Sequence, residues 1–325
     1  MPTVGRHLAL LLPLLWATLL PWSAGATQQS FADWLHGVRR EAAQRGVRPQ
    51  TLEVALAGLA PIPRVLELDR KQPETTLTFQ QYYERVVSQA RIEHGRRQHE
   101  ENRLLLGELT RKYRVPGQFI VALWGVETDY GRITGGYPVI AALATLAYDS
   151  RRSSFFRQEL LHALRILDEG HVQPKAMLGS WAGAMGQNQF MPSSFLSYAV
   201  DHDGDGRRDI WQNRGDALAS IANYLARVGW AHELDWGVEV VLPSPYLADR
   251  SATRPWLVWQ DEGVRLATGR PPPDPLLLTL VLPERGAQNP AYLVTQNFQS
   301  LMRWNRSNYF ALSVGLLADA IAAGR

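Results

Sequence analysis

The sequence contains no cysteine. Disulfide bonds, thiol catalysis, cysteine-ligated zinc and iron–sulfur clusters are therefore excluded. Lysine is scarce: the chain has only Lys71, Lys112 and Lys175, and the other Lys+Arg positions are arginines. With 34 basic and 31 acidic residues the formal net charge is +3. A protein that tracks phosphate backbones needs a strongly basic face, so we expect no nucleic-acid partner.

Apolar runs of membrane-spanning length are also missing. The run over residues 8–20 is shorter than the ~20 residues of a spanning helix. Arg6 precedes this run, and residues 24–26 (Ala-Gly-Ala) have the small-x-small pattern that signal peptidase recognises. We interpret residues 1–26 as a signal peptide, with an uncleaved interfacial anchor as the alternative. Since no cysteine follows the run, we expect no membrane anchor on the mature protein, which is soluble in the periplasm of a Gram-negative bacterium.

The full sequence is 46% hydrophobic and 20% charged, which is a composition typical of globular proteins. Apolar periodicity predicts a mainly α (α+β) fold. Helices are expected over residues 31–58, 78–113, 116–130, 140–148, 155–167, 192–200, 217–228 and 292–323. Short apolar runs predict strands over residues 238–242, 257–259 and 276–282. We therefore expect a helical domain over residues 27–235, a small β-rich lobe over residues 236–290 and a C-terminal helical segment over residues 291–325.

Glu127 is the main chemical candidate. Ile120, Leu123 and Trp124 lie seven, four and three residues before it, so the carboxyl falls on the apolar stripe of a predicted helix. An apolar environment and the negative end of the helix dipole both disfavour ionisation. A carboxyl that stays protonated near neutral pH can act as a general acid. The alternative is a core glutamate paired with an arginine.

Residues 179–192 form a loop rich in glycine and amides. Ser180, Gln187, Asn188 and Gln189 supply neutral donors and acceptors, which suit a polyhydroxylated ligand. The order of residues differs from that of a phosphate loop or a dinucleotide fingerprint.

The segment over residues 201–212 resembles an EF-hand loop. It has carboxylates at loop positions one, three and five and a glycine at position six. The predicted Ca²⁺ ligands are Asp201, Asp203, Asp205, the carbonyl of Arg207, and Asp209. Gln212 replaces the usual bidentate glutamate, so binding should be weakened. The alternative is an Asp/Gly turn without a metal.

Several motifs occur together in a fixed order. They are WGVET at 124–128, GR at 131–132, ALATL at 142–146, RR at 151–152, FMPSS at 190–194, NY at 223–224 and WNRSNY at 304–309. This series, with the two loops, resembles the lytic murein transglycosylase B family (glycoside hydrolase family 103) over most of the mature chain.

The resemblance implies a lysozyme-like helical catalytic domain with a smaller β-containing lobe. It implies that peptidoglycan glycan strands are cleaved between N-acetylmuramic acid and N-acetylglucosamine without water, which leaves 1,6-anhydromuramic ends. Glu127 matches the single catalytic glutamate of the family, acting first as acid and then as base. No cofactor is required for this chemistry, and a Ca²⁺ ion in the loop over residues 201–212 would be structural. Other cell-wall enzymes are candidate partners.

The resemblance also implies a set of substrate-binding residues. These are Ser180, Gln189, Tyr224, Asn305, Arg151, Arg152 and Tyr82. Two alternatives stay open: Tyr224 belongs to the core, or one of the two arginines forms a structural ion pair. A lysozyme-type hydrolase and a non-catalytic glycan-binding protein are the rival functions.

The signal-peptide interpretation predicts a defined mature terminus. Protein recovered from the periplasm should begin at Thr27, since cleavage follows Ala26. N-terminal sequencing of the soluble fraction measures this. Recovery of intact Met1 in the membrane fraction would contradict the interpretation.

Overall fold

The computed structural model describes residues 29–71, 77–149, 152–243, 252–267, 269, 271–273, 275–284 and 290–323. The predicted signal peptide and Arg151 lie outside the described residues. The helices are α1 (Phe31–Gln44), α2 (Pro49–Leu56), α3 (Pro63–Arg70), α4 (Phe79–Val86), α5 (Gln89–Glu101), α6 (Arg103–Tyr113), α7 (Gly117–Thr128), α8 (Val139–Tyr148), α9 (Ser153–Asp168), α10 (Pro192–Tyr198), α11 (Arg214–Arg227), α12 (Trp256–Asp261), α13 (Gln296–Trp304) and α14 (Asn308–Ala322). The strands are β1 (Tyr137–Pro138), β2 (Leu178–Gly179), β3 (Gly237–Val241), β4 (Thr253–Pro255), β5 (Arg265–Leu266), β6 (Leu277–Val281) and β7 (Ala291–Val294).

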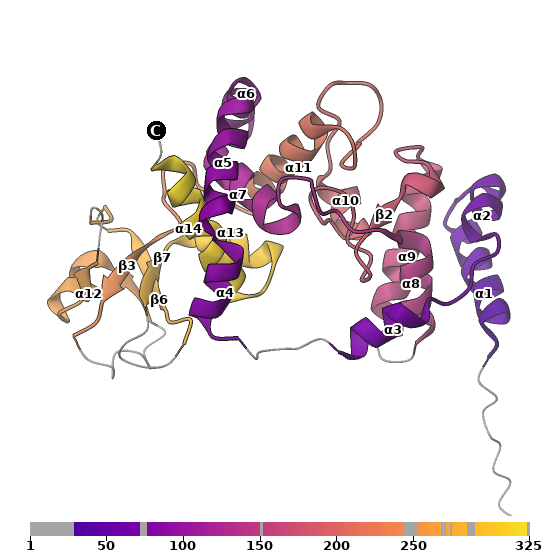
Figure 1. Cartoon of the computed structure of the whole chain (residues 1–325), viewed down its shortest axis with the longest axis horizontal. Helices are drawn as coiled ribbons and strands as arrows, with labels where there is room; N and C mark the ends of the chain where they lie inside the picture. The colour runs from indigo at the N-terminus through magenta and orange to yellow at the C-terminus, as the bar shows by residue number, and fades with distance from the viewer. Residues whose placement is uncertain are drawn as a thin grey trace, which may run out of the picture.

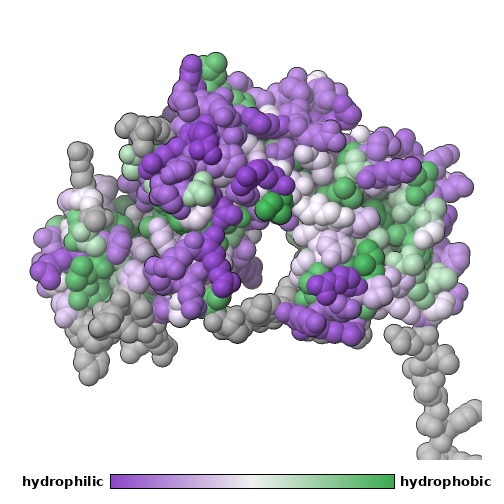
Figure 2. All heavy atoms as spheres, in the orientation of Figure 1, coloured by the Kyte–Doolittle hydropathy of each residue, from purple (hydrophilic) through white to green (hydrophobic). Residues whose placement is uncertain are grey.

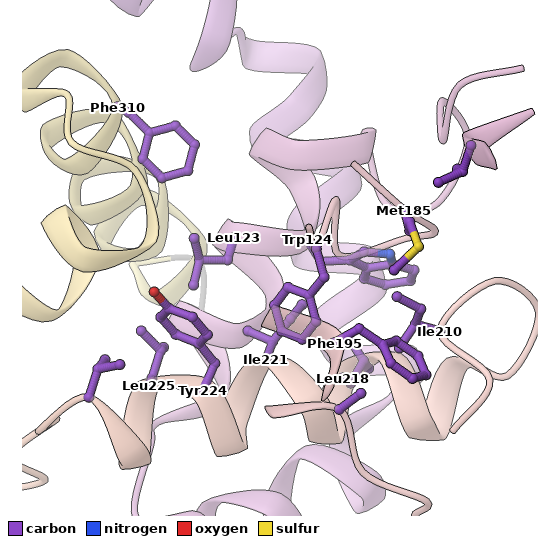
Figure 3. Packing of buried hydrophobic residues seen from close by; sticks show 14 of the residues in the cluster. Leu123, Trp124, Met185, Phe195, Ile210, Leu218, Ile221, Tyr224, Leu225 and Phe310 are labelled. Carbon is purple, nitrogen blue, oxygen red and sulfur yellow. The ribbon is translucent and has the colours of Figure 1, made fainter. Parts of the chain in front are cut away.

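Helix α7 lies at the centre of the larger part of the fold. It packs against α14, α5, α11 and α6, and almost all of its residues are buried. Figure 3 shows Leu123 and Trp124 facing the apolar side chains of α11, among them Ile221. The helix ends at Thr128 because the next residues, Asp129 and Tyr130, adopt left-handed backbone angles with φ of 53° and 63°.

A second group of helices packs around α8 and α9. Helix α9 contacts α8, α10, α2 and α1, and α3 packs against α8. This group lies at the opposite end of the molecule from the five-stranded sheet (Figure 1). The face seen in Figure 2 is hollowed between this group and the part that carries α4 and α5. Within the described residues, no helix combines the length and apolar character needed to cross a bilayer.

The β-rich lobe is one antiparallel sheet in the order β4-β6-β7-β3-β5. It has its own small apolar core around Trp256, Trp259 and Leu293. The predicted mainly α (α+β) class is therefore confirmed, with a small antiparallel sheet beside a helical domain.

Several sequence predictions about individual elements are wrong. Residues 257–259 belong to helix α12 and not to a strand, because Trp256 and Trp259 are buried three positions apart while Leu257 is exposed. The helix expected to begin at Tyr292 starts at Gln296, since Tyr292 lies in β7 between β3 and β6.

The third error concerns the single long helix expected over residues 78–113. The chain forms α4, α5 and α6 instead. Thr78 and Gln81 form a capping box that begins α4, and the hydroxyl of Ser88 accepts a hydrogen bond from the N–H of Arg91 to begin α5. A side-chain cap thus begins α5, whereas the break at Asn102 between α5 and α6 has no side-chain cap. The helices expected over residues 31–58 and 292–323 are likewise divided, into α1 and α2 and into α13 and α14.

The contact between α14 and Trp236 is too close for a side chain at Gly315. A Cβ there would overlap the indole ring, which is fully buried. We expect Gly315→Ala to lower the free energy of unfolding by about 1–3 kcal/mol, because overpacking outweighs the gain in helix propensity. Urea unfolding measures this.

A matched control is Gly107→Ala in α6, where the nearest atom to a new Cβ is the end of the Arg111 side chain at 3.7 Å. This variant should gain about 0.5–1 kcal/mol. Equal stability of the two variants would contradict the packing argument.

Candidate active site

Glu127 lies in the last turn of α7. Protein surrounds its carboxyl on most sides, although part of the side chain reaches the surface. Burial raises the pKa of Glu127 to about 7, and a hydrogen bond from Trp304 partly opposes this shift. In that bond the indole N–H donates to Oε1 over 2.6 Å. A carboxyl with this pKa can give and take a proton near neutral pH.

The end of α7 is tied to the glycine-rich loop. The Thr128 hydroxyl donates to the carbonyl of Gln187 at 2.9 Å and accepts from the N–H of Gly131 at 3.0 Å. The side-chain oxygen of Gln187 accepts from the indole N–H of Trp124 at 3.1 Å. These bonds fix the turn that follows Glu127.

Asp129, two residues after Glu127, has a structural role. Its carboxylate pairs with Arg91 on α5 and with Arg132 just beyond the turn. The carboxylate therefore stabilises the connection between α5 and the end of α7. Within the described residues, burial and the hydrogen bond from Trp304 account for the shift in the pKa of Glu127.

Tyr82 lies near the carboxyl, and Asn305 is next in the chain to the residue that binds it. Tyr82 on α4 is half-buried, and the charge of Glu127 helps to raise the pKa of its phenol, after burial. Its ring packs against Tyr309 with centroids 5.7 Å apart. Asn305 is exposed and directly follows Trp304 at the end of α13.

Ser180 and Gln189 lie in the glycine-rich loop and use part of their hydrogen-bonding capacity within it. The Ser180 hydroxyl accepts from the N–H of Ala184 at 3.1 Å. The Gln189 amide donates to the carbonyls of Thr134 and Gly186, both at 3.0 Å. Both side chains are half-buried.

Tyr224 and Arg152 are held more firmly by the protein itself. Tyr224 is buried on α11, and its hydroxyl donates to the carbonyl of Arg303 at 2.7 Å. Arg152 pairs with the buried carboxylate of Asp69 and lies over the ring of Phe156. A structural ion pair was the alternative for one of the two arginines, and Arg152 forms one. Arg151 is not among the described residues.

Trp304 is the site residue that the sequence reasoning missed. The sequence placed it only in an apolar pattern and a motif, and no spacing rule connects positions 177 residues apart. The one available signal was its position next to Asn305, which the resemblance assigned to the sugar cleft.

The predicted calcium loop brings its first three carboxylates together. Oxygens of Asp201, Asp203 and Asp205 lie within 4.8 Å of one another. The Asp201 carboxylate also accepts the N–H groups of Gly204 and Gly206, at 2.7 and 2.8 Å, which curls the backbone around it. This donor set of hard oxygens fits Ca²⁺.

The other predicted ligands are less completely arranged. One oxygen of Asp209 accepts from the N–H groups of Trp211 and Gln212. The side chain of Arg207 pairs with Asp205. The buried Asp216 accepts the N–H groups of His202 and Asp209, both at 2.7 Å, and so holds the two ends of the loop. A Ca²⁺ ion would be held by Asp201, Asp203 and Asp205, with the Arg207 carbonyl and Asp209 completing the set.

A carboxyl whose pKa burial raises to about 7, in a hollowed, lysozyme-like helical fold, is typical of enzymes that break glycosidic bonds by acid–base catalysis. The chain belongs to the transglycosylase SLT domain family, whose model matches residues 30–319. The resemblance to the lytic murein transglycosylase B family is confirmed.

Three known proteins document this similarity. Membrane-bound lytic murein transglycosylase B of Escherichia coli (strain K12) is 30% identical over 292 residues, covering 87% of this chain and 80% of the relative. SltB3 from Pseudomonas aeruginosa, solved with NAG-anhNAM-pentapeptide, is 44% identical with a TM-score of 0.86, covering 91% of this chain and 81% of that one. The E. coli lytic transglycosylase Slt35, solved with calcium, is 28% identical with a TM-score of 0.78, covering 90% of this chain and 93% of that one.

The carboxylate cluster predicts a stabilising effect of calcium. Calcium should raise the melting temperature, because an ion that binds only the folded state adds about 2.7 kcal/mol at 100 times Kd. Differential scanning calorimetry with calcium and with chelator measures this. Asp203→Asn is the control and should lose most of the response. Identical melting temperatures in calcium and chelator would show that the loop is only a turn.

Proposed function

We propose that this protein is a lytic transglycosylase in which Glu127 is the only acid and base. It cleaves the β-1,4 bond between N-acetylmuramic acid and N-acetylglucosamine in peptidoglycan. The observation that carries the proposal is the state of the Glu127 carboxyl. Burial raises its pKa to about 7, and no charged partner is present among the described residues. A retaining glycosidase needs a second carboxylate as nucleophile, and substrate-assisted enzymes do not.

The proposed reaction uses the same carboxyl twice. Protonated Glu127 gives its proton to the glycosidic oxygen as the bond to C1 of the muramic residue breaks. The acetamido group of the substrate stabilises C1. The Glu127 carboxylate then takes the proton of the C6 hydroxyl as its oxygen bonds to C1, which closes the 1,6-anhydro ring and restores the acid.

We infer that several other residues bind the glycan. Tyr82 supplies an aromatic face beside Glu127, and Ser180 and Gln189 offer polar groups from the glycine-rich loop. Asn305 offers an exposed amide at the end of α13. Tyr224 contributes its ring edge and its hydroxyl oxygen as an acceptor. The hydroxyl cannot donate to the glycan, because it already donates to the carbonyl of Arg303.

The two arginines are proposed to attract the lactyl-linked peptides of peptidoglycan, which carry carboxylates. Arginine can bind such groups bidentately. Arg152 is only half-exposed and is anchored by Asp69, so its contribution is a fixed positive charge. Action on the cell wall, together with the predicted signal peptide, supports a periplasmic location and contact with other cell-wall enzymes.

Glu127→Gln tests the proposal. The amide keeps the size of the side chain and cannot transfer a proton, so activity on purified sacculi should fall by at least about 10²–10⁴-fold. The variant should stay folded. Because the pKa of Glu127 is raised in the folded state, wild-type stability declines as pH rises from about 4.5 to about 7, and the variant should lack this decline.

Mass analysis of the released muropeptides tests the reaction type. The wild-type product should be one water lighter than a hydrolytic product. A reducing-end product would move the protein to the lysozyme-type alternative. Substantial activity of Glu127→Gln would refute the role of Glu127.

A further inference from the structure

The two oxygens of the Glu127 carboxyl have different surroundings. Oε1 accepts the indole N–H of Trp304 over 2.6 Å. No described residue makes a hydrogen bond with Oε2, and this oxygen is not among the fully buried atoms that lack a partner, so it reaches the surface. The carboxyl thus has one oxygen bound by the protein and one oxygen open to a ligand.

An indole N–H can only donate. Oε1 must therefore remain an acceptor in both protonation states of Glu127. The hydroxyl oxygen of a carboxylic acid is a poorer acceptor than its carbonyl oxygen, so a proton on Oε1 would weaken the bond from Trp304. The proton consequently belongs on Oε2, the oxygen that a substrate can reach.

We propose that Trp304 is a positioning residue for the reaction, fixing Oε1 so that the exchanged proton always leaves from and returns to Oε2. This inference rests on the proposed function of Glu127. In the acid step Oε2 loses its proton to the glycosidic oxygen, and the N–H of Trp304 stabilises the carboxylate that remains. In the base step Oε2 takes the C6 hydroxyl proton, and the starting acid is restored.

The indole ring is held in place by its neighbours. It lies 4.7 Å from the ring of Tyr224 and 5.2 Å from that of Phe190, measured between centroids. The Tyr224 hydroxyl donates to the carbonyl of Arg303, and the Arg303 guanidinium donates to the carbonyl of Val228 at 2.6 Å. The residue before Trp304 is thereby attached to Tyr224 on α11 and to Val228 just beyond it, which fixes the backbone that carries the indole.

Few other charged groups face Glu127 from the elements around it. Tyr82 on α4 is the titratable group that feels its charge. Arg91 on α5 pairs with Asp129, and Tyr309 on α14 donates to Glu284. On α11 and α13, the hydroxyl of Tyr224 and the guanidinium of Arg303 are used as described above. The donor at Oε1 is therefore the main polar influence on the carboxyl.

Trp304→Phe removes the N–H and keeps an aromatic ring. The matched control is Trp230→Phe, because Trp230 is a buried tryptophan that packs on Phe119 and has a ring N–H without a partner among the described residues. Trp304→His is the rescue variant, since Nε2 of its five-membered ring takes the place of the indole N–H. Full-length proteins with ¹³C-labelled glutamate are titrated by NMR, and Glu127→Gln identifies the Glu127 signal.

Loss of the N–H should raise the pKa of Glu127 by about one unit, because a donor favours the charged form. The alkaline limb of kcat/KM on soluble peptidoglycan fragments should move to higher pH by the same amount, since the acid step needs protonated Glu127. Trp304→His should move both back down, and Trp230→Phe should move neither.

Lower activity of Trp304→Phe with an unchanged pKa and an unchanged alkaline limb would overturn the inference, because packing alone would then explain the loss. The inference would also be overturned if Trp304→Phe had the activity, the Glu127 pKa and the alkaline limb of the wild type. If circular dichroism shows that Trp304→Phe is unfolded, Trp304→His is compared with the wild type instead. The two measurements are again the pKa of Glu127 by NMR and the alkaline limb of kcat/KM. Activity in Glu127→Gln would instead overturn the proposed function, while the NMR pKa still reports on the contact with Trp304.

Discussion

The removal of one carboxyl from water is the constraint on which the rest of the site depends. Glu127 is placed at the end of a helix that is buried on nearly all sides, and burial is the largest influence on its pKa. A buried polar group needs a partner, and Trp304 supplies one without adding charge. A charged partner such as arginine would have stabilised the carboxylate and so removed the proton that the chemistry needs.

The parts that keep the carboxyl in this state come from distant positions in the chain. Helices α5, α6, α11 and α14 enclose α7, and the glycine-rich loop fixes its last turn through Thr128 and Gln187. Aromatic rings from the loop, α11 and α13 meet at Phe190, Tyr224 and Trp304. Each contact is an ordinary packing or hydrogen-bonding interaction, and together they leave only one carboxyl oxygen accessible.

Much of this could be predicted from the sequence where the signal is local. The apolar residues three, four and seven positions before Glu127 place it on a buried helix face, and the spacing of Asp201, Asp203 and Asp205 brings their oxygens together. The single helix expected over residues 78–113 is wrong because the cap at Ser88 begins a new helix and a second break follows at Asn102. Strand β7 was missed because a short buried strand and the start of a helix have similar apolar patterns. The contacts of Trp304 and Arg152 join remote segments, which periodicity cannot show.

The order of the elements along the chain has a consequence for when activity arises. Helix α7 is made early, whereas α13 with Trp304 and α14, which packs against α7, are among the last segments to be synthesised. A growing chain therefore carries Glu127 before it carries the indole that binds Oε1. The hydrogen bond that fixes the carboxyl can form only after α13 has been synthesised, so the site is completed late in the folding of this domain.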